Sequence, residues 1–301
     1  MRKLIAIGTT VFLMSACSSA PETTANSDAP FSVADYGGVV EGPVQRRLSW
    51  MEGDYQNDYE PDRKVAEAEA ARYTAKVPDP SDVDEYLEYL SVLDASGKKA
   101  EAEKKMKAFL ANNPKEKRAA FILGVHYMRI GKKELAGHFF SQLEKDNSFP
   151  WKSLLYNNLG MMALQDKNRD AAIAHFEKAI KSGPPTAAPY VNLGALYLQS
   201  KSYGDALALF KKAYDIDEDF EDAALGYGVS LEGIGKHEEA QKIYAEYNEN
   251  HPNSLSTLYN NAVVLGNRLK RRDEAAQLML RYIQRGGKET AKAHEIIQSW
   301  R

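Results

Sequence analysis

The chain has 301 residues, of which 44% are hydrophobic and 27% charged, and its formal net charge is -3. These proportions are typical of a globular protein with a sizeable core, and the charge does not favour a polyanionic partner such as nucleic acid. The single cysteine, Cys17, excludes an intrachain disulfide and a zinc site built on paired cysteines.

The N-terminus has the three-part layout of a secretory signal. Arg2 and Lys3 precede an apolar run, Leu4–Met14, which ends in the small residues Ser15 and Ala16. The run is about 11 residues long, whereas a membrane-spanning helix needs roughly 20. The sequence therefore predicts cleavage of this segment.

The segment "LMSAC", Leu13–Cys17, resembles the signal of bacterial lipoproteins, in which a small residue precedes a cysteine that becomes diacylated. Met14 stands where that family prefers leucine. The resemblance implies a signal peptide over 1–16 and a mature chain that begins at Cys17. Because Ser18 and not aspartate follows, it also implies sorting to the outer membrane. Several acyl chains on one residue would anchor the chain firmly. The alternative is an ordinary cleavage site with an incidental thiol.

Two segments separate this signal from the rest of the chain. Residues 17–60 are rich in Ser, Ala, Pro, Asp, Glu and Gly and show no sustained periodicity, which predicts a disordered tether. Residues 61–82 begin with Pro61-Asp62, a typical helix start, and continue with an Ala/Glu/Lys-rich stretch. They are predicted to form an N-terminal helix and a linker.

From residue 83 the sequence repeats itself. The motifs "YNNLG", "YVNLG", "ALGYG" and "YNNAV", which begin at Tyr156, Tyr190, Ala224 and Tyr259, are 34, 34 and 35 residues apart. In these motifs the sequence resembles the tetratricopeptide repeat (TPR) family, whose repeats are helical hairpins of 34 residues. The resemblance implies an all-α fold, a superhelical solenoid of six TPR helix-turn-helix repeats with a C-terminal capping helix. The predicted repeats span 83–116, 117–150, 153–186, 187–220, 221–254 and 256–289, and the capping helix spans 290–301.

Three positions of the repeat carry this resemblance. Position 20 is alanine in every repeat, and the facing position 8 is glycine in four of them, because two helices approach closely only where their contact residues are small. Position 24 is large and apolar. In chain order these positions are Ala102, Ala136, Ala172, Ala206, Ala240 and Ala275; Gly124, Gly160, Gly194 and Gly228; and Met106, Phe140, Phe176, Phe210, Tyr244 and Met279.

No catalytic, metal or cofactor site is predicted. The six histidines lie far apart without a His-Glu-x-x-His spacing, and we interpret them as surface or groove residues. The carboxylates are interpreted as solvated charges on outward helix faces. Gly226-x-Gly228 follows no Rossmann strand, and Gly228 already belongs to the repeat pattern. The sequence therefore predicts a binding protein and not an enzyme.

In the TPR family, ligands lie along the first helix of each hairpin. In this register the corresponding positions are apolar in repeats two to five, and asparagines accompany them. An exposed apolar surface of this kind marks a binding site. The predicted partner-binding residues are Phe121, Val125, Met128, Asn157, Asn158, Met161, Leu164, Val191, Asn192, Ala195, Leu198, Leu225 and Val229.

The kind of ligand follows from what this groove lacks. TPRs that clamp a chaperone's C-terminal carboxylate need a lysine at position 5, where this sequence has Phe121, Asn157 and Leu225. An apolar or amphipathic segment is therefore the expected ligand. The alternative occupant is the chain itself, through its linker or the helix from about Asp62.

One basic cluster stands out near the C-terminus. The stretch "RLKRRDE", 268–274, has Arg281, Arg285 and Lys288 nearby. It is either a solvated turn between helices or a patch for an acidic partner or anionic lipid headgroups.

With both resemblances, the chain is similar to envelope TPR lipoproteins of Gram-negative bacteria. One branch comprises pilotins, which dock an outer-membrane secretin of a pilus or secretion system, although the long tether departs from that branch's short spacer. The other scaffolds peptidoglycan hydrolases or a periplasmic protease. We therefore expect a lipid-anchored, periplasm-facing scaffold for an envelope protein, with no nucleic-acid partner, and the oligomeric state stays open.

Overall fold

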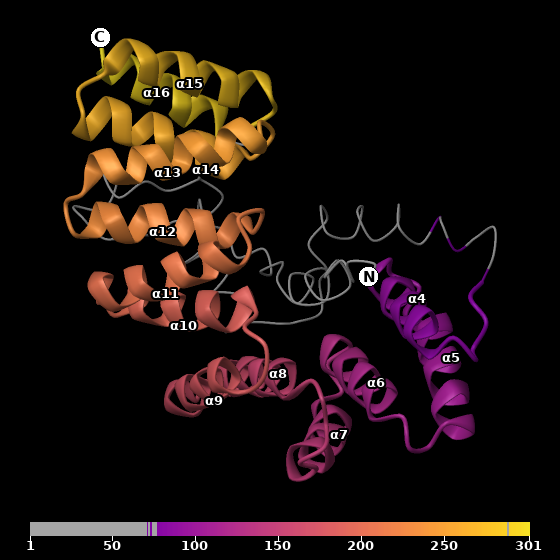
Figure 1. The fold of residues 1–301 in the computed structure, drawn as a ribbon. Helices are drawn as coiled ribbons and strands as arrows, with labels where there is room; N and C mark the ends of the chain where they lie inside the picture. Colours follow the sequence, from indigo (N-terminus) through magenta and orange to yellow (C-terminus); the bar gives the residue numbers. More distant parts are fainter. Residues whose placement is uncertain (1–70, 72, 74–76, 288) are drawn as a thin grey trace. The chain divides into compact units, whose positions relative to one another are not determined.

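The computed structural model describes Ala71, Tyr73 and residues 77–287 and 289–301. The predicted signal peptide, Cys17 and the tether lie outside the described residues. Within the described part, every regular element is helical, with thirteen α-helices, α4–α16, and one π-helical segment, η2 (Figure 1). The all-α fold predicted from the repeats is thus confirmed.

The helices belong to two compact units that divide between Pro184 and Pro185. The helices of unit 1 are α4 (Val83–Ala95), α5 (Lys99–Asn112), α6 (Lys117–Arg129), α7 (Lys133–Lys145), α8 (Lys152–Gln165) and α9 (Arg169–Lys181). Those of unit 2 are α10 (Ala187–Gln199), α11 (Tyr203–Ile216), α12 (Glu221–Gly233), α13 (His237–Asn250), α14 (Leu255–Val263), η2 (Val264–Arg268), α15 (Arg272–Gln284) and α16 (Thr290–Ser299).

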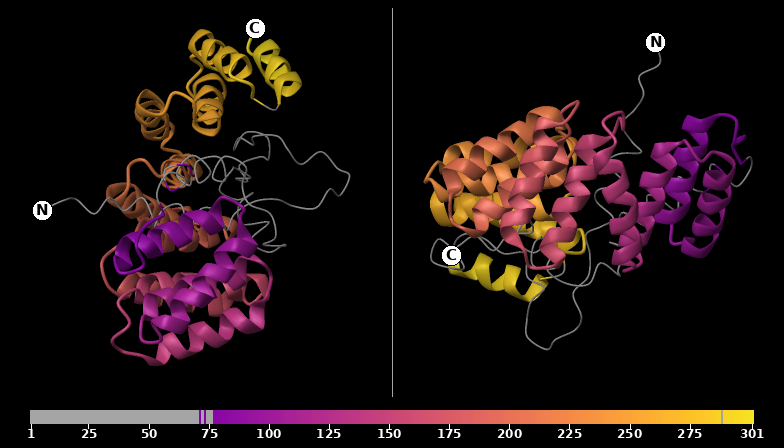
Figure 2. Two further views of the ribbon diagram at one scale, coloured as in Figure 1. Left: turned by 90° about the vertical axis from the view of Figure 1, so that its right-hand side faces the viewer. Right: turned by 90° about the horizontal axis from the view of Figure 1, so that it is seen from below.

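Each unit is a stack of helical hairpins. In unit 1, α4 packs on α5, α6 on α7 and α8 on α9, and each first helix also contacts the first helix of the next hairpin. In unit 2 the hairpins are α10 with α11, α12 with α13, and α14–η2 with α15, stacked in the same way (Figures 1 and 2). This nearest-neighbour packing is the arrangement that TPR hairpins adopt.

Small and large residues meet as the repeat pattern predicts. The six alanines at position 20 are wholly buried, and the large residues at position 24 are exposed by at most 1%. A Cβ atom added at Gly160 would lie 2.5 Å from the Phe176 ring, and one at Gly228 would lie 2.3 Å from the Tyr244 ring. Only glycine fits at these positions, because any side chain would overlap the ring behind it.

The turn inside each hairpin uses a left-handed residue. Gly97, Gly131 and Gly235 occupy this conformation in three repeats. In the other three, Lys167, Lys201 and Lys270 adopt φ values of 57°, 58° and 60°. The left-handed conformation costs a residue with a Cβ roughly 1–2 kcal/mol, so these lysine turns are strained.

The last hairpin contains one residue more than its neighbour. The helix caps Phe220 and Ser254 are 34 positions apart, whereas the turn residues Gly235 and Lys270 are 35 apart. The extra residue is taken up inside the helix at η2, where the Leu269 amide donates to the Val264 carbonyl oxygen, five residues back, at 3.0 Å. This π-turn keeps the hairpin closed despite the insertion.

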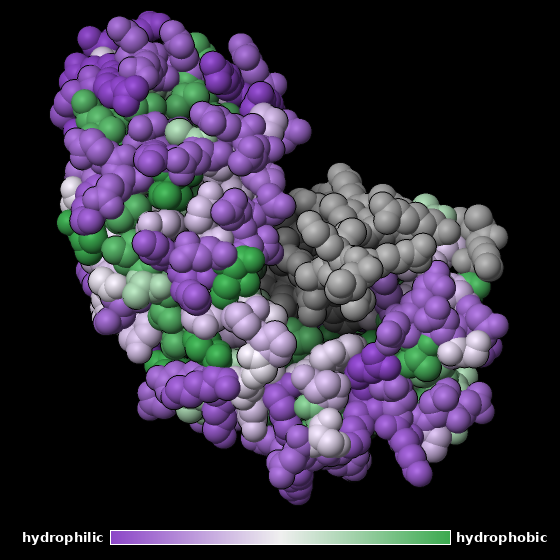
Figure 3. Space-filling model, in the orientation of Figure 1, coloured by the Kyte–Doolittle hydropathy of each residue, from purple (hydrophilic) through white to green (hydrophobic). Residues whose placement is uncertain are grey.

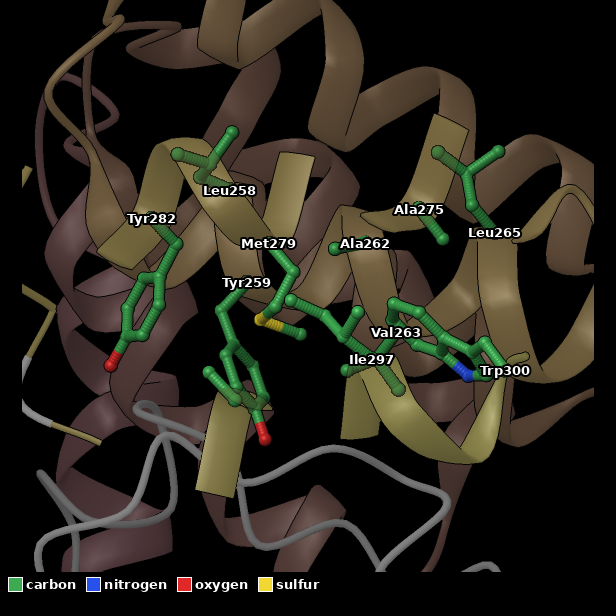
Figure 4. Close-up of a cluster of buried hydrophobic side chains, with 11 residues drawn as sticks. Leu258, Tyr259, Ala262, Val263, Leu265, Ala275, Met279, Tyr282, Ile297 and Trp300 are labelled. Carbon is green, nitrogen blue, oxygen red and sulfur yellow. The ribbon is translucent and has the colours of Figure 1, made fainter. Parts of the chain in front are cut away.

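Helix α16 covers the end of unit 2. Its Ile297 and the following Trp300 face Val263 and Met279 of the last hairpin in one buried cluster (Figure 4). The Trp300 ring also takes the space beside Gly266, where an added Cβ would lie 2.2 Å from it. Within the described residues, no helix is both long and apolar enough to cross a bilayer.

Candidate functional site

The predicted partner-binding residues lie on the first helices of four hairpins. In unit 1 they come from α6 and α8, and in unit 2 from α10 and α12. The two helices of each pair are in contact, so the structure brings these side chains together within each unit. Apolar and amide side chains on neighbouring first helices thus form one candidate cluster per unit.

These side chains are buried. Twelve of the thirteen predicted residues are exposed by 6% or less, and Asn192 is half-buried. The open apolar surface that the sequence suggested is therefore not what the structure presents at these positions. Their role in partner binding stays a prediction.

Phe121 shows why one of these positions is buried. Its ring centroid lies 5.8 Å from that of Phe140, 5.7 Å from that of Phe149 and 5.9 Å from that of Trp151. Phe149 and Trp151 precede α8 and did not stand out in the sequence. Phe121 therefore packs inside unit 1 between consecutive hairpins.

The asparagines of the first helices differ in their hydrogen bonds. The Asn158 amide donates to the Leu154 carbonyl oxygen at 2.9 Å. Gln241 of α13 donates to Asn261 of the last hairpin at 3.4 Å. The neighbouring Asn260 amide nitrogen is buried without a hydrogen-bond partner among the described residues. A buried donor without a partner costs about 1–3 kcal/mol, which makes Asn260 a further candidate for contact with a ligand carbonyl.

A charged cluster lies buried between the first two hairpins of unit 1. Asp94 on α4 and His126 on α6 are wholly buried, and Arg129 on α6 is exposed by 1%. His126 Nδ1 lies 2.7 Å from Asp94 Oδ1, and Arg129 Nη1 donates to Asp94 Oδ2 at 2.6 Å. Burial alone would raise the pKa of Asp94, but the guanidinium and the imidazole hold it below its ordinary value.

This cluster corrects two sequence interpretations. His126 was expected at the surface or in the groove, and the carboxylates were expected in solvent. Asp94 and His126 are 32 positions apart, and Asp94 and Arg129 are 35 apart, so the separations bracket the repeat period. Opposite charges at that spacing are the signal that would have predicted a contact between adjacent hairpins.

The Asp94–His126 pair does not act as half of a catalytic triad. The second ring nitrogen of His126 faces Glu103 at 3.6 Å, and His126 is wholly enclosed. A general base must reach a substrate or a nucleophile, and this imidazole reaches neither. In the described part of the chain, no group of three or more potential ligands is arranged to hold a metal ion.

A second buried carboxyl lies in unit 2. Glu232 on α12 is exposed by 6%, and the Tyr244 hydroxyl donates to it at 3.0 Å. Burial raises the pKa of Glu232 to about 8, while the Tyr244 hydrogen bond and the charge of Arg268 oppose that shift. Glu232 is therefore protonated at neutral pH, which also corrects its expected place in solvent.

Family profiles identify the repeats. Three profiles described as tetratricopeptide repeat match residues 91–148, 151–219 and 197–262, which together are more than half of the chain. No curated protein matches the sequence at a significant level.

Solved structures share the fold at low sequence identity. PilF of Pseudomonas aeruginosa has a TM-score of 0.56 and 17% identity over 79% of this chain and 97% of its own. YrrB, described as a TPR protein with an unusual peptide-binding site, has a TM-score of 0.50 and 20% identity over 63% of this chain and 96% of its own. Yeast Tom70 has a TM-score of 0.54 and 11% identity over 97% of this chain and 69% of its own. With its alanine positions, hairpin stacking and profile matches in agreement, the chain belongs to the tetratricopeptide repeat family and is a scaffold for protein–protein interaction.

Proposed function

We propose that this TPR protein is a lipid-anchored, periplasm-facing scaffold of the outer membrane that captures an apolar or amphipathic segment of an envelope protein. The observation that carries the binding role is the gathering of apolar and amide side chains on contacting first helices, α6 with α8 and α10 with α12. Amides can pair with the backbone of a bound segment, and Asn192 is the half-buried amide of this set. A solved TPR protein of similar fold, YrrB, is described as having a peptide-binding site, which supports this mode.

We propose that the protein serves a pilus, secretion or motility complex as an assembly factor of the pilotin type. The support is the lipoprotein-like "LMSAC" segment combined with six TPRs. The match to the structural neighbour PilF covers 97% of that chain, which supports a comparable array of repeats. At 17% identity, the match supports no more than the fold. The second candidate is a scaffold for peptidoglycan hydrolases or a periplasmic protease, which the long tether favours.

Partner capture can be tested at Asn192. This residue of α10 is half-buried, so a photoreactive amino acid can replace it with little disturbance of the core. We expect crosslinking in intact envelopes to attach a second protein at this position. The matched control is Lys212, an exposed residue on α11 of the same hairpin, where we expect no specific product. Mass spectrometry of the product identifies the partner.

The outcomes separate the candidates. A secretin or another assembly component supports the pilotin-type role, and a hydrolase or protease supports the second candidate. A product formed only within the chain itself at Asn192 contradicts partner capture and supports occupancy by the chain's own linker. Equal capture at Asn192 and Lys212 contradicts the assignment of the site to the first helices.

The proposed anchor is tested by Cys17→Ser. We expect this variant to lose incorporation of labelled fatty acid and to leave the outer-membrane fraction, because no acyl chain can attach. Its helical circular dichroism should match the wild type, since Cys17 lies far outside the repeats in sequence. A variant that still sediments with the outer membrane would show that another contact places the protein there.

A further inference from the structure

Basic side chains gather where η2 ends and α15 begins. Arg268, Lys270, Arg271 and Arg272 are all exposed there, although the whole chain has a net charge of -3. We name these four residues the basic corner. Two exposed carboxylates, Asp273 and Glu274, follow it directly.

The capping helix adds a cation to this corner. The indole nitrogen of Trp300 donates to Asn267 Oδ1 at 2.6 Å, which fixes the end of α16 beside the turn. The Trp300 ring, lodged against Gly266, holds the same position by packing. The exposed Arg301, which follows Trp300, therefore lies next to the basic corner.

Most of the positive charge at the corner is not neutralised within unit 2. Arg271 is paired with Glu274 at 2.8 Å. Within the described residues, Arg268, Lys270 and Arg272 form no ion pair, and the Lys270 ammonium donates to the Asn267 carbonyl oxygen at 2.8 Å. The charge of Arg268 acts on Glu232, whose pKa of about 8 leaves it protonated at neutral pH. The corner therefore carries cations available to an outside anion.

The shape of the corner favours a broad anionic surface as its ligand. The cations stand on a turn between two helices, and Lys270 holds that turn in the left-handed conformation at φ 60°. Exposed cations on a turn can reach a flat anionic surface, whereas an acidic peptide is bound best in a groove with partners for its backbone. Figure 3 shows mainly hydrophilic residues over this end of unit 2 and no broad apolar patch in that view.

We propose that the basic corner binds anionic phospholipid headgroups and so gives the protein a second, electrostatic contact with a membrane. Each cation near an anionic bilayer surface adds to the attraction, and the effect is screened by salt. In the cell this proposal relies on the membrane location proposed above, because the headgroups must be within reach. It does not depend on partner capture by the first helices.

The test compares two triple variants of the full chain. Arg268→Glu/Lys270→Glu/Arg272→Glu reverses the corner, and Lys201→Glu/Lys211→Glu/Lys212→Glu makes the same charge change on exposed lysines of repeat 4. Both keep Cys17 and the N-terminal apolar segment, so any binding through those is equal. Binding is measured by co-sedimentation with phosphatidylcholine vesicles that contain 30% phosphatidylglycerol or none.

We expect the corner variant to lose about 100-fold in its partition onto the phosphatidylglycerol vesicles, and the control variant to lose far less. We also expect wild-type binding to these vesicles to fall steeply as NaCl is raised. Equal losses in the two variants would overturn the proposal, since net charge alone would then explain the result. Unchanged vesicle binding by the corner variant would overturn the proposal too. If that variant instead lost capture of an acidic protein, the ligand of the corner would be a protein. None of these outcomes alters crosslinking at Asn192, which tests the scaffold role separately.

Discussion

Replacement of Arg129 by methionine is expected to lower the free energy of unfolding by about 3–5 kcal/mol at pH 7. The substitution keeps the length of the side chain but leaves the Asp94 carboxylate, which is wholly buried, without its guanidinium partner. A buried charge that loses its partner keeps its desolvation cost and loses the interaction that offset it. Urea denaturation followed by circular dichroism measures the change.

The matched control lies on the same helix. Arg118 of α6 pairs with Glu116 at 2.9 Å and with Asp84 of α4 at 2.5 Å, both near the surface, so Arg118→Met should cost less than about 1 kcal/mol. The double variant Arg129→Met/Asp94→Asn should be more stable than Arg129→Met alone, because it removes the stranded charge. If Arg129→Met cost no more than Arg118→Met, the buried cluster would not be holding the two hairpins together.

The same pair has a predictable dependence on pH. Because the pKa of Asp94 is lower in the folded chain, its stabilising contribution is present above the ordinary aspartate pKa and is lost as pH falls through the folded value. Arg129→Met removes the main charge that lowers this pKa. The stability difference between wild type and Arg129→Met should therefore shrink as the pH is lowered from 7 to about 3.

Glu232→Gln is expected to stabilise the protein at pH 8 by about 4 kcal/mol and to have little effect at pH 4. The pKa of Glu232 is raised from 4.5 to about 8, so the folded chain keeps a proton that the unfolded chain has lost. Stability therefore falls as pH rises between these two values. Glutamine carries no charge at any pH and can still accept the hydrogen bond from Tyr244.

The measurement is the unfolding free energy of Glu232→Gln minus that of the wild type from pH 4 to pH 9. This difference should rise with pH, and all groups common to both proteins cancel in it. Glu238→Gln, an exposed glutamate on the following helix α13, is the control and should give a flat difference. A flat difference for Glu232→Gln would mean that the carboxyl is solvated, contrary to its 6% exposure.

The hairpins could be predicted from the sequence because each one has residues of the same size at the same contact positions. Position 20 must be small wherever the two helices of a hairpin touch, so alanine recurs and the period becomes visible. The exposed fractions of Ala102 and Ala275, at opposite ends of the array, are both 0%. Even the ambiguous Gly226-x-Gly228 motif was resolved correctly by the repeat, since the two glycines face the Phe210 and Tyr244 rings.

The burial of single polar residues could not be predicted in the same way. Asp94 and Glu232 occupy the same position of their repeats as Met128 and Leu164, yet the first is ionised beside an arginine and the second is protonated beside a tyrosine. These outcomes depend on which side chains the next helix presents. Residue type and position within one repeat do not contain that information.

Because of the π-turn at η2, the last repeat is not readily replaced by another repeat of the array. Repeat arrays evolve by duplicating and deleting units, which works when each unit ends in the same register as it began. Here the extra residue lies in the segment that also supplies Gly266 and Asn267, the two contacts that receive Trp300. A chain shortened by removing repeat 6, or lengthened by copying repeat 5 in its place, would present the capping helix with a surface that lacks both. These two contacts thus tie the capping helix to the last repeat.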